Sequence, residues 1–183
     1  MELYFATTNR NKFREVCRIL GFKIKQVKLE IPEIQSFDLR EIVEDKVKKA
    51  YERIRKPVIV EDTALYIKSW NGFPGPFIGW VIKTMGIEGV CRLVGKERSA
   101  RARACVGYYD GKRMEIFSGE VKGEIAKEPR GRRRFDWDRI FIPSGFSRTF
   151  AEMSIEEKNR ISHRMKAFVK VKRSLHSSCE KIY

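Results

Sequence analysis

The stretch YFATTNRNKFREVCRIL, residues 4–20, contains the transition on which the predicted fold depends. The apolar run at its start is interrupted by TTNRN, a group of small polar residues typical of helix N-termini. Apolar side chains then recur at the spacing of one helix face, at Phe13, Val16, Ile19 and Leu20. The stretch therefore predicts a strand at 1–6 that is followed by a helix at 11–20.

The next segments repeat this alternation of strand and helix. Apolar and basic residues alternate in FKIKQVKL, 22–29, which predicts a strand with one solvent-exposed face. The segment 38–55 begins with a capping aspartate and has apolar residues at helical spacing, and Pro57 follows it. VIVED, 58–62, then indicates a buried strand that ends in two acids. This β-α-β-α-β order predicts an α/β fold, in which ligands bind at strand ends and in the adjoining loops.

The second half of the chain has a different residue pattern, which predicts other elements. Residues 101–126 alternate and contain Asp110-Gly111, a strong hairpin-turn signal, so they predict a β-meander that forms a second lobe. The remaining elements are predicted as a loop, a short strand and a helix, at 127–139, 140–143 and about 160–175.

The composition limits the classes of protein to consider. The 183 residues carry 39 Lys and Arg against 24 Asp and Glu, and the net charge of +15 attracts polyanions from nucleic acid to nucleoside triphosphates. No apolar run approaches the roughly 20 residues of a membrane span, and the start does not read as a secretory signal, so we expect no membrane partner. Four cysteines are scattered without a CxxC pair, which favours neither a zinc site nor disulfides. These features are typical of a reduced, cytoplasmic protein.

Thr7, Asn9 and Lys12 form the first candidate site, where the predicted strand meets the predicted helix. Free backbone N–H groups at a helix N-terminus and the point charge of a lysine can together hold a phosphate. The alternative interpretation is simple helix capping by the polar side chains, with a solvated lysine.

Carboxylates form the second candidate site. Glu33 lies in the loop after the second predicted strand, and Glu61 and Asp62 end the third. Carboxylates at neighbouring strand ends can share one Mg²⁺, which prefers oxygen ligands and keeps part of its water. One carboxylate can also accept a proton from an attacking water. Each acid alone reads as a turn residue, but their place beside a phosphate-type loop favours a metal site.

The segment RGRRRFDWDRIF, 130–141, is the third candidate. Its five arginines are interleaved with Phe135 and Trp137. Aromatic faces stack on bases and arginine pairs with phosphate, so the segment suits nucleotide contact. The alternative is a basic surface loop whose aromatic rings lie in the core.

The segment EEKNRISHRMKAF, 156–168, is the fourth candidate. Lys158 and Ser162 are expected to share one face of a helix. His163 is one of only two histidines, and by itself it reads as a structural residue.

Seven short motifs occur in order over almost the whole chain. They are Thr7-x-Asn9-x-x-Lys12, PEIQ at 32–35, VEDTAL at 60–65, GFPGP at 72–76, FDWDRIF at 135–141, TFAEM at 149–153 and EKNRISHR at 157–164. Each is weak evidence alone, but the series is highly specific. In this series the chain resembles the inosine triphosphate pyrophosphatase family, the Ham1-like house-cleaning nucleotidases.

The resemblance implies a fold, an activity and partners. The fold would be an elongated, two-lobed α/β structure, in which helices flank a central mixed β-sheet and a deep active-site cleft lies between the lobes. One domain would span 1–183, with lobes at about 1–66 plus 140–183 and at 67–139. The activity would be Mg²⁺-dependent hydrolysis of the purine nucleoside triphosphates ITP, dITP and XTP to the monophosphate and pyrophosphate. Mn²⁺ would be a substitute metal, and the assembly would be a homodimer.

The resemblance also implies roles for individual residues. Thr7, Asn9 and Lys12 would hold the triphosphate, and Lys12 would also be catalytic. Glu33 and Asp62 would bind Mg²⁺, and Asp62 would be the base for the attacking water.

Other residues would contact the rest of the nucleotide. Phe135 and Trp137 would flank the purine ring. The further contacts would come from Asp138, Lys158, His163 and Arg164, of which the last two would reach toward the 6-oxo edge. Donors aimed at this oxygen reject adenine, which presents an amino group there.

The sequence departs from the family pattern inside this implied base pocket. Asp136 stands where the family usually has glycine, and Arg139 stands where it has proline. A related nucleotide pyrophosphatase with altered base specificity is therefore one alternative. A basic nucleic-acid-binding protein is the other, because the net charge and the arginine-rich segment favour it, and we expect weak non-specific nucleic-acid binding in either case.

Overall fold

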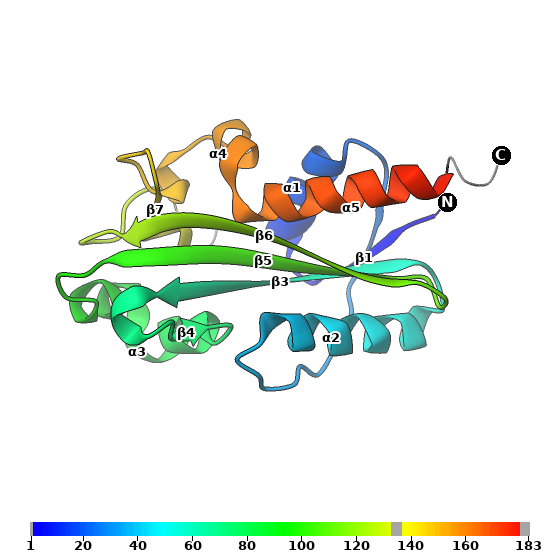
Figure 1. The fold of residues 1–183 in the computed structure, drawn as a ribbon, viewed down its shortest axis with the longest axis horizontal. Coiled ribbons are helices and arrows are strands. Elements are labelled where there is room, and N and C mark those ends of the chain that lie inside the picture. The colour runs from blue at the N-terminus through cyan, green and yellow to red at the C-terminus, as the bar shows by residue number, and fades with distance from the viewer. Residues whose placement is uncertain (1, 133–136, 180–183) are drawn as a thin grey trace. The chain divides into compact units, whose positions relative to one another are not determined.

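The computed structural model describes residues 2–132 and 137–179 (Figure 1). The strands are β1 (Tyr4–Ala6), β2 (Lys25–Val27), β3 (Val58–Ile67), β4 (Pro74–Gly75), β5 (Ser99–Tyr109), β6 (Met114–Ile125) and β7 (Phe141–Pro143). The helices are α1 (Arg10–Leu20), α2 (Leu39–Ile54), α3 (Ile78–Leu93), α4 (Ile155–Ile161) and α5 (His163–Cys179). Short 3₁₀ helices lie at Lys68–Trp70, Trp137–Arg139 and Phe150–Glu152. None of the helices in the described ranges is long and apolar enough to cross a membrane.

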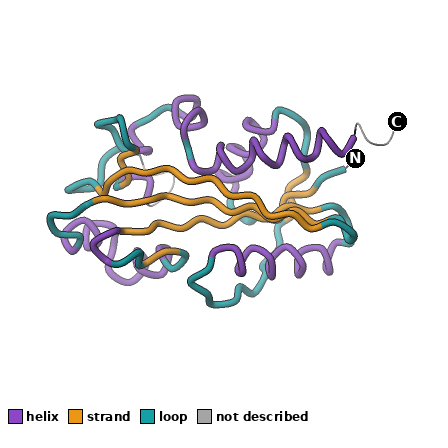
Figure 2. Tube along the Cα trace, in the orientation of Figure 1, coloured by secondary structure: helices purple, strands orange, loops and turns teal. Residues whose placement is uncertain are grey.

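The strands form a mixed sheet that helices flank, as predicted. They pair in the order β2-β1-β3-β5-β6-β7, and β4 pairs with β3. β1 runs parallel to β2 and to β3, whereas β4 is antiparallel to β3 and β7 is antiparallel to β6. Figure 2 shows the three long strands β3, β5 and β6 side by side.

Local capping interactions fix the helix starts and the hairpin turn, as the sequence predicts. Asn9 accepts hydrogen bonds at Oδ1 from the backbone N–H groups of Asn11 (2.9 Å) and Lys12 (3.0 Å), so α1 begins directly after it. Asp38 caps α2 by accepting a hydrogen bond from the N–H of the second helical residue at 2.8 Å. Between β5 and β6, Asp110 Oδ1 accepts from the N–H groups two and three residues later, at 2.9 and 2.8 Å.

Two predicted strands have other bounds in the structure. The strand predicted at 22–29 forms only in its middle, as β2. The strand predicted at 58–62 continues as β3 to Ile67, because the residues after the acids, TALYI, return to the core. Glu61 and Asp62 therefore lie inside the strand, and the prediction that they end it is wrong.

The predicted C-terminal helix is two helices, α4 and α5. The residue between them, Ser162, has an extended backbone with a ψ of 156°, and its N–H donates to the carbonyl of Lys158 at 2.9 Å. The prediction that Lys158 and Ser162 share a helix face is therefore wrong. The sequence hides the break because apolar residues keep helical spacing across it, at Ile161, Met165 and Phe168.

The chain divides into two compact units, each with its own core. The first contains the residues up to Asp62, residues 104–119 and the residues from Arg164 onward. In it, apolar side chains of β1, β3 and β5 pack against α1 and α5, and the rings of Phe5 and Phe168 meet edge to face at 6.0 Å. On the other face of β5, Gly107 permits a close approach of α2, since a Cβ there would lie 2.9 Å from a valine methyl group.

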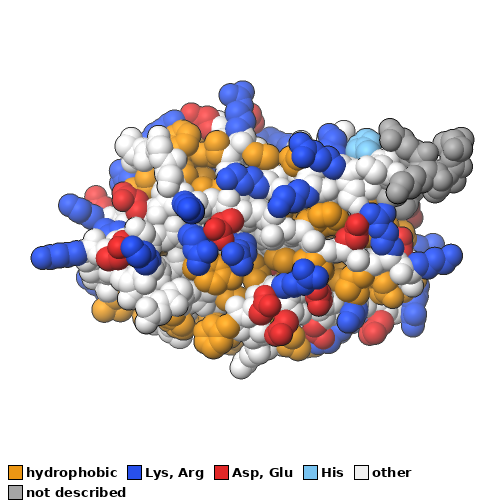
Figure 3. Space-filling view, in the orientation of Figure 1, with side chains coloured by type: hydrophobic (Ala, Val, Ile, Leu, Met, Phe, Trp, Pro, Cys, Tyr) orange, Lys and Arg blue, Asp and Glu red, His pale blue; other side chains and the backbone are white. Residues whose placement is uncertain are grey.

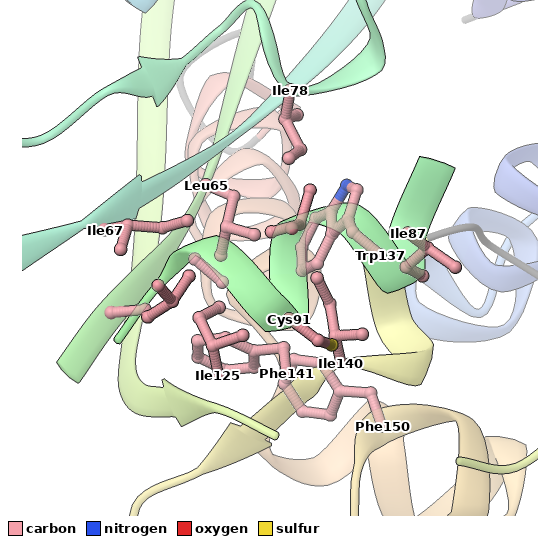
Figure 4. Close-up of a cluster of buried hydrophobic side chains, with 14 of the residues drawn as sticks. Leu65, Ile67, Ile78, Ile87, Cys91, Ile125, Trp137, Ile140, Phe141 and Phe150 are labelled. Atoms are coloured by element: carbon pink, nitrogen blue, oxygen red, sulfur yellow. The ribbon is translucent and has the colours of Figure 1, made fainter. Parts of the chain in front are cut away.

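The second unit contains Thr63–Arg103 and Glu120–His163. Figure 4 shows its core, in which residues of β3, α3 and β6 surround a group of aromatic rings. Phe141 lies 6.2 Å from Trp137 in an edge-to-face contact and 5.2 Å from Phe150, measured between ring centroids. The aromatic packing holds the 3₁₀ helices on either side of β7 in place.

Candidate active site

A cavity of about 690 Å³ in the first unit gathers the residues predicted to hold the triphosphate and the metal. Its lining includes Thr7, Asn9, Lys12, Glu33 and Asp62. They come from the β1–α1 turn, the loop between β2 and α2, and β3. The other charged residues of the lining are Lys46 of α2, Glu61 of β3 and Glu30, which lies in the same loop as Glu33.

The β1–α1 turn presents a capped helix N-terminus to this cavity. Thr7 Oγ1 accepts a hydrogen bond from the N–H of Asn9 at 3.1 Å, and Asn9 Oδ1 accepts from the N–H groups of Asn11 and Lys12. The capping interpretation is therefore correct for these side chains. The N-terminal end of the helix dipole still points at the cavity, and it favours an anion there.

Lys12 and Arg164 share one buried carboxylate. Glu61, whose side chain is fully buried, lies 3.0 Å from Lys12 Nζ through Oε2 and accepts a hydrogen bond from Arg164 Nε at Oε1, also at 3.0 Å. Arg164 is 2 % exposed and also donates through Nη1 to Glu15 of α1. Two cations and two carboxylates thus balance in the interior, where an unpaired charge would be costly. Arg164, which was predicted to reach toward the 6-oxo edge of the purine, is thus bound by Glu15 and Glu61.

Lys46 occupies the point at which the two predicted metal ligands meet. Its ammonium lies 3.4 Å from Asp62 Oδ2 and also donates to Glu33 Oε1. Burial acts to lower the pKa of Lys46, but the charges of Asp62 and Glu33 outweigh it, so the pKa is raised above its ordinary value. Lys46 is therefore fully protonated at neutral pH, and both carboxylates are directed at one cationic centre.

The loop that carries Glu33 is anchored to α2 by two further basic residues. Lys49 Nζ donates to the carbonyl oxygen of Pro32 at 3.1 Å, and Arg53 Nη1 donates to that of Glu30 at 2.5 Å. With Lys46 they lie at helical spacing along α2. One basic face of this helix therefore sets the position of the Glu33 loop.

Apart from Arg164, the predicted base contacts that the structure describes lie in the second unit. Lys158 Nζ donates to Asp138 Oδ2 at 2.5 Å, and both side chains are buried. The ring of His163, 1 % exposed, lies 5.1 Å from that of Trp137 and 5.9 Å from that of Phe150. Trp137 itself belongs to the core of this unit, as the alternative interpretation of the aromatic residues expects.

Two residues named in the sequence analysis are not described by the structure. Phe135, predicted to flank the purine, and Asp136, the first departure from the family pattern, lie outside the described residues. Within the described ranges, no group of three or more His, Cys, Asp or Glu residues is placed to hold a metal. The predicted ligands Glu33 and Asp62 are a pair, and they meet on Lys46.

Sequence reasoning missed Lys46 and Glu15. Lys46 lies in the helical segment EDKVKKA, where a lysine looks like part of a solvated face. Glu15 directly precedes Val16, on the face of α1 that is buried, and only 6 % of it is exposed. A charged residue at a core position of a helix was the available signal for Glu15.

The fold and the cavity together define an α/β protein with a pocket lined by lysines and carboxylates at a helix N-terminus. Residues 3–174 match the model of the Ham1 family, and the chain belongs to this family. The resemblance found in the seven motifs is thereby confirmed.

Curated relatives match the chain over nearly their full length. The dITP/XTP pyrophosphatase of Methanopyrus kandleri is 44% identical over 173 residues, which cover 91% of this chain and 92% of the relative. That of Saccharolobus solfataricus is 43% identical over 180 residues, covering 96% and 94%. The inosine triphosphate pyrophosphatase of Schizosaccharomyces pombe is 39% identical over 181 residues, covering 96% and 95%.

Solved structures show the same fold. A HAM1 protein from Coxiella burnetii superposes with a TM-score of 0.81 at 27% identity, covering 97% of this chain and 99% of that one. The Staphylococcus aureus Ham1 protein, at 23% identity, superposes with a TM-score of 0.78, covering 97% and 100%. The predicted α/β fold class with a central mixed sheet is confirmed.

Proposed function

We propose that this protein is a nucleoside triphosphate pyrophosphatase that removes non-standard purine nucleotides. It hydrolyses ITP, dITP and XTP to the monophosphate and pyrophosphate. The observation that carries this proposal is the cavity in which a helix N-terminus, two lysines and four acidic residues lie together, in a chain whose relatives are named for this activity. Such a set suits phosphoryl chemistry, which depends on positioning and on charge stabilisation and needs no covalent nucleophile.

The phosphate end of the substrate binds at the β1–α1 turn. Thr7 and Asn9 hold the turn in shape, and the helix N-terminus favours the negative charge. Lys12 and Lys46 supply point charges on two sides of the cavity. Both lysines are paired with carboxylates in the structure, so they exchange these partners for phosphate oxygens when substrate binds.

Glu33 and Asp62 hold a divalent cation, Mg²⁺ with Mn²⁺ as a substitute. Their donor set fits such an ion, because two hard carboxylates already converge on one cationic group, the ammonium of Lys46. The bound ion neutralises charge on the triphosphate. Asp62 accepts the proton of the attacking water.

The purine end is recognised by donors and aromatic faces. The family resemblance assigns the contact with the 6-oxo group to His163 and Arg164, further nucleotide contacts to Asp138 and Lys158, and the two faces of the ring to Phe135 and Trp137. The buried ion pair of Asp138 with Lys158 gives these side chains fixed positions. A site built to donate to O6 leaves a buried donor unpaired when adenine enters, which produces strong rejection.

The assembly and location follow from the family resemblance. We expect a homodimer in the cytoplasm. Weak non-specific nucleic-acid binding by the basic surface accompanies the main activity, because the net charge is +15.

Pyrophosphate release tests the proposal. The panel is ITP, XTP, dITP, ATP, GTP and UTP, each with Mg²⁺ and with EDTA. Asp62→Asn removes the proposed base and a metal ligand, and Glu128→Gln, an exposed carboxylate elsewhere, is the matched control. We expect selective turnover of ITP, XTP and dITP that EDTA and Asp62→Asn abolish and Glu128→Gln retains. Equal turnover of all six nucleotides, or full activity in Asp62→Asn, would contradict the proposal.

A further inference from the structure

A second cavity, of about 650 Å³, lies in the second unit on strands β3, β5 and β6. Three basic side chains and three neutral ones that can donate hydrogen bonds line it, together with Tyr66. The basic residues are Lys68, Arg101 and Lys122, and the neutral ones are Asn71, Ser99 and Ser144. No carboxylate belongs to the described lining. The lining is therefore rich in donors and positive in charge.

Tyr66 orders the arginine side of this cavity. The guanidinium carbons of Arg101 and Arg103 lie 5.6 and 5.3 Å from the centroid of its ring. Arg103 donates to Glu120 from both Nε (3.0 Å) and Nη2 (2.7 Å), whereas Arg101 is 3.6 Å from the same carboxylate. Figure 3 shows Lys and Arg side chains gathered over β5 and β6. Glu120 is thus bound mainly by Arg103, and Arg101 keeps most of its hydrogen-bonding capacity for another anion.

The two lysines of the cavity are also available to an anion. Lys122 is exposed and forms no ion pair with the described residues. Lys68 lies 2.9 Å from Glu97, but these side chains are 70% and 46% exposed. An ion pair at such exposure is weak, so Lys68 can exchange its partner for a ligand at little cost.

We propose that this cavity binds a small phosphate-bearing anion, such as inorganic pyrophosphate or a nucleoside phosphate, at a place separate from the candidate active site. Arginine and lysine side chains with neutral donors around them are the usual partners of phosphate oxygens. The cavity is similar in volume to the one proposed for the triphosphate substrate, about 650 against 690 Å³.

The two cavities should differ in whether anion binding needs a divalent cation, because the described lining of the second cavity contains no acid. The first cavity contains Glu30, Glu33, Glu61 and Asp62, so an anion without a metal meets fixed negative charge there. The second cavity presents three cations and no carboxylate in its described lining. Anion binding at the second cavity therefore needs no divalent cation.

Calorimetric titration of the full-length protein in EDTA tests the inference. Pyrophosphate and ITP are titrated separately into the unaltered protein and into three variants. Arg101→Ser/Lys122→Ala removes two cations of the cavity, Lys96→Ala removes an exposed lysine of the same unit that does not line it, and Lys12→Ala weakens the first cavity. Lys122→Glu, a change at one exposed position, repeats the test with less risk to folding.

We expect one metal-independent binding event per chain, weakened about tenfold or more by Arg101→Ser/Lys122→Ala and by Lys122→Glu. Lys96→Ala and Lys12→Ala should bind as the unaltered protein does. Absence of binding in EDTA, or binding that Lys12→Ala abolishes and the double variant keeps, overturns the inference. Binding of a single-stranded oligonucleotide but of neither small anion also overturns it, in favour of a nucleic-acid surface. Pyrophosphatase activity with Mg²⁺ is measured separately, so either proposal can fail alone.

Discussion

Replacing Lys46 by methionine should strengthen metal binding while it weakens catalysis. In the structure the Lys46 ammonium holds the two carboxylates that we assign to the metal, and its raised pKa keeps it charged at neutral pH. An incoming Mg²⁺ must therefore displace it. Methionine keeps the length and the apolar stem of lysine but removes the competing charge.

The size of the effect follows from the exposure of the three side chains. Lys46, Asp62 and Glu33 are 15%, 22% and 47% exposed, so their ion pairs are partly screened by water. Pairs of this kind contribute about 0.2–1 kcal/mol each, so two pairs on one ammonium contribute about 0.4–2 kcal/mol. Since about 1.4 kcal/mol is tenfold in affinity, Lys46→Met should tighten Mg²⁺ binding by about 2- to 30-fold.

Two assays read out the opposite effects. Mg²⁺ is titrated calorimetrically into nucleotide-free protein. Pyrophosphate release from ITP gives kcat/KM, which should fall about 100-fold because the Lys46 ammonium no longer stabilises the negative charge that develops on the phosphate. Lys48→Met, an exposed lysine on the same helix, controls for the change in net charge. If Lys46→Met binds Mg²⁺ no more tightly than Lys48→Met does, the carboxylates are not the metal ligands and the reasoning is refuted.

Three further predictions concern stability, each measured by urea denaturation. Asp138→Ala leaves the buried ammonium of Lys158 without this partner and should cost about 3–5 kcal/mol, whereas the double change Asp138→Leu/Lys158→Met should recover most of the loss; a cost below about 1 kcal/mol would show that water reaches the pair. Gly107→Ala should cost about 1–3 kcal/mol, because its Cβ would lie 2.9 Å from a valine of α2, while Gly79→Ala, where nothing lies within 4 Å, should not destabilise; equal effects would contradict the close packing. Burial acts to raise the pKa of Asp110, but the N–H donors of the turn outweigh it and hold the pKa below 3.8, so its charge stabilises the fold above that pH and the effect is lost as the pH falls through the lowered pKa. Asp110→Asn should therefore be less stable than the unaltered protein at neutral pH and equally stable in strong acid, and a deficit that persists in acid would argue against the linkage.

Short-range features of this fold could be predicted because their causes lie within a few residues. Asn9 caps α1, Asp38 caps α2 and Asp110 closes the β5–β6 turn, each through a backbone N–H two or three positions away. Such contacts depend on residue type and spacing alone. The motif series added the residues predicted to bind phosphate and metal, and the structure places all of these residues on one cavity.

Long-range charge pairs could not be predicted in this way. Lys46 meets partners 13 and 16 positions away, and Arg164 meets Glu15 across 149 positions. Only the packing of α1, α2 and α5 with β3 and the Glu33 loop brings these groups together, and nothing in the local pattern separates such a lysine from a solvated one. The break at Ser162 was not predicted because apolar residues keep helical spacing across it, at Ile161, Met165 and Phe168.

The pairing of the lysines also explains why metal and substrate should bind together. In the first cavity Lys12 is held by Glu61, and Lys46 by Glu33 and Asp62, so the positive charge needed for a triphosphate is already neutralised. If Glu33 and Asp62 held a divalent cation, Lys46 would lose both carboxylate partners and would pair with the phosphates instead. Each ligand would then lower the free energy of binding the other, which is the definition of positive coupling. By reciprocity, ITP should increase the affinity for Mg²⁺ by the same factor by which Mg²⁺ increases the affinity for ITP. In Lys46→Met this part of the coupling should disappear, because no ammonium is left to be exchanged.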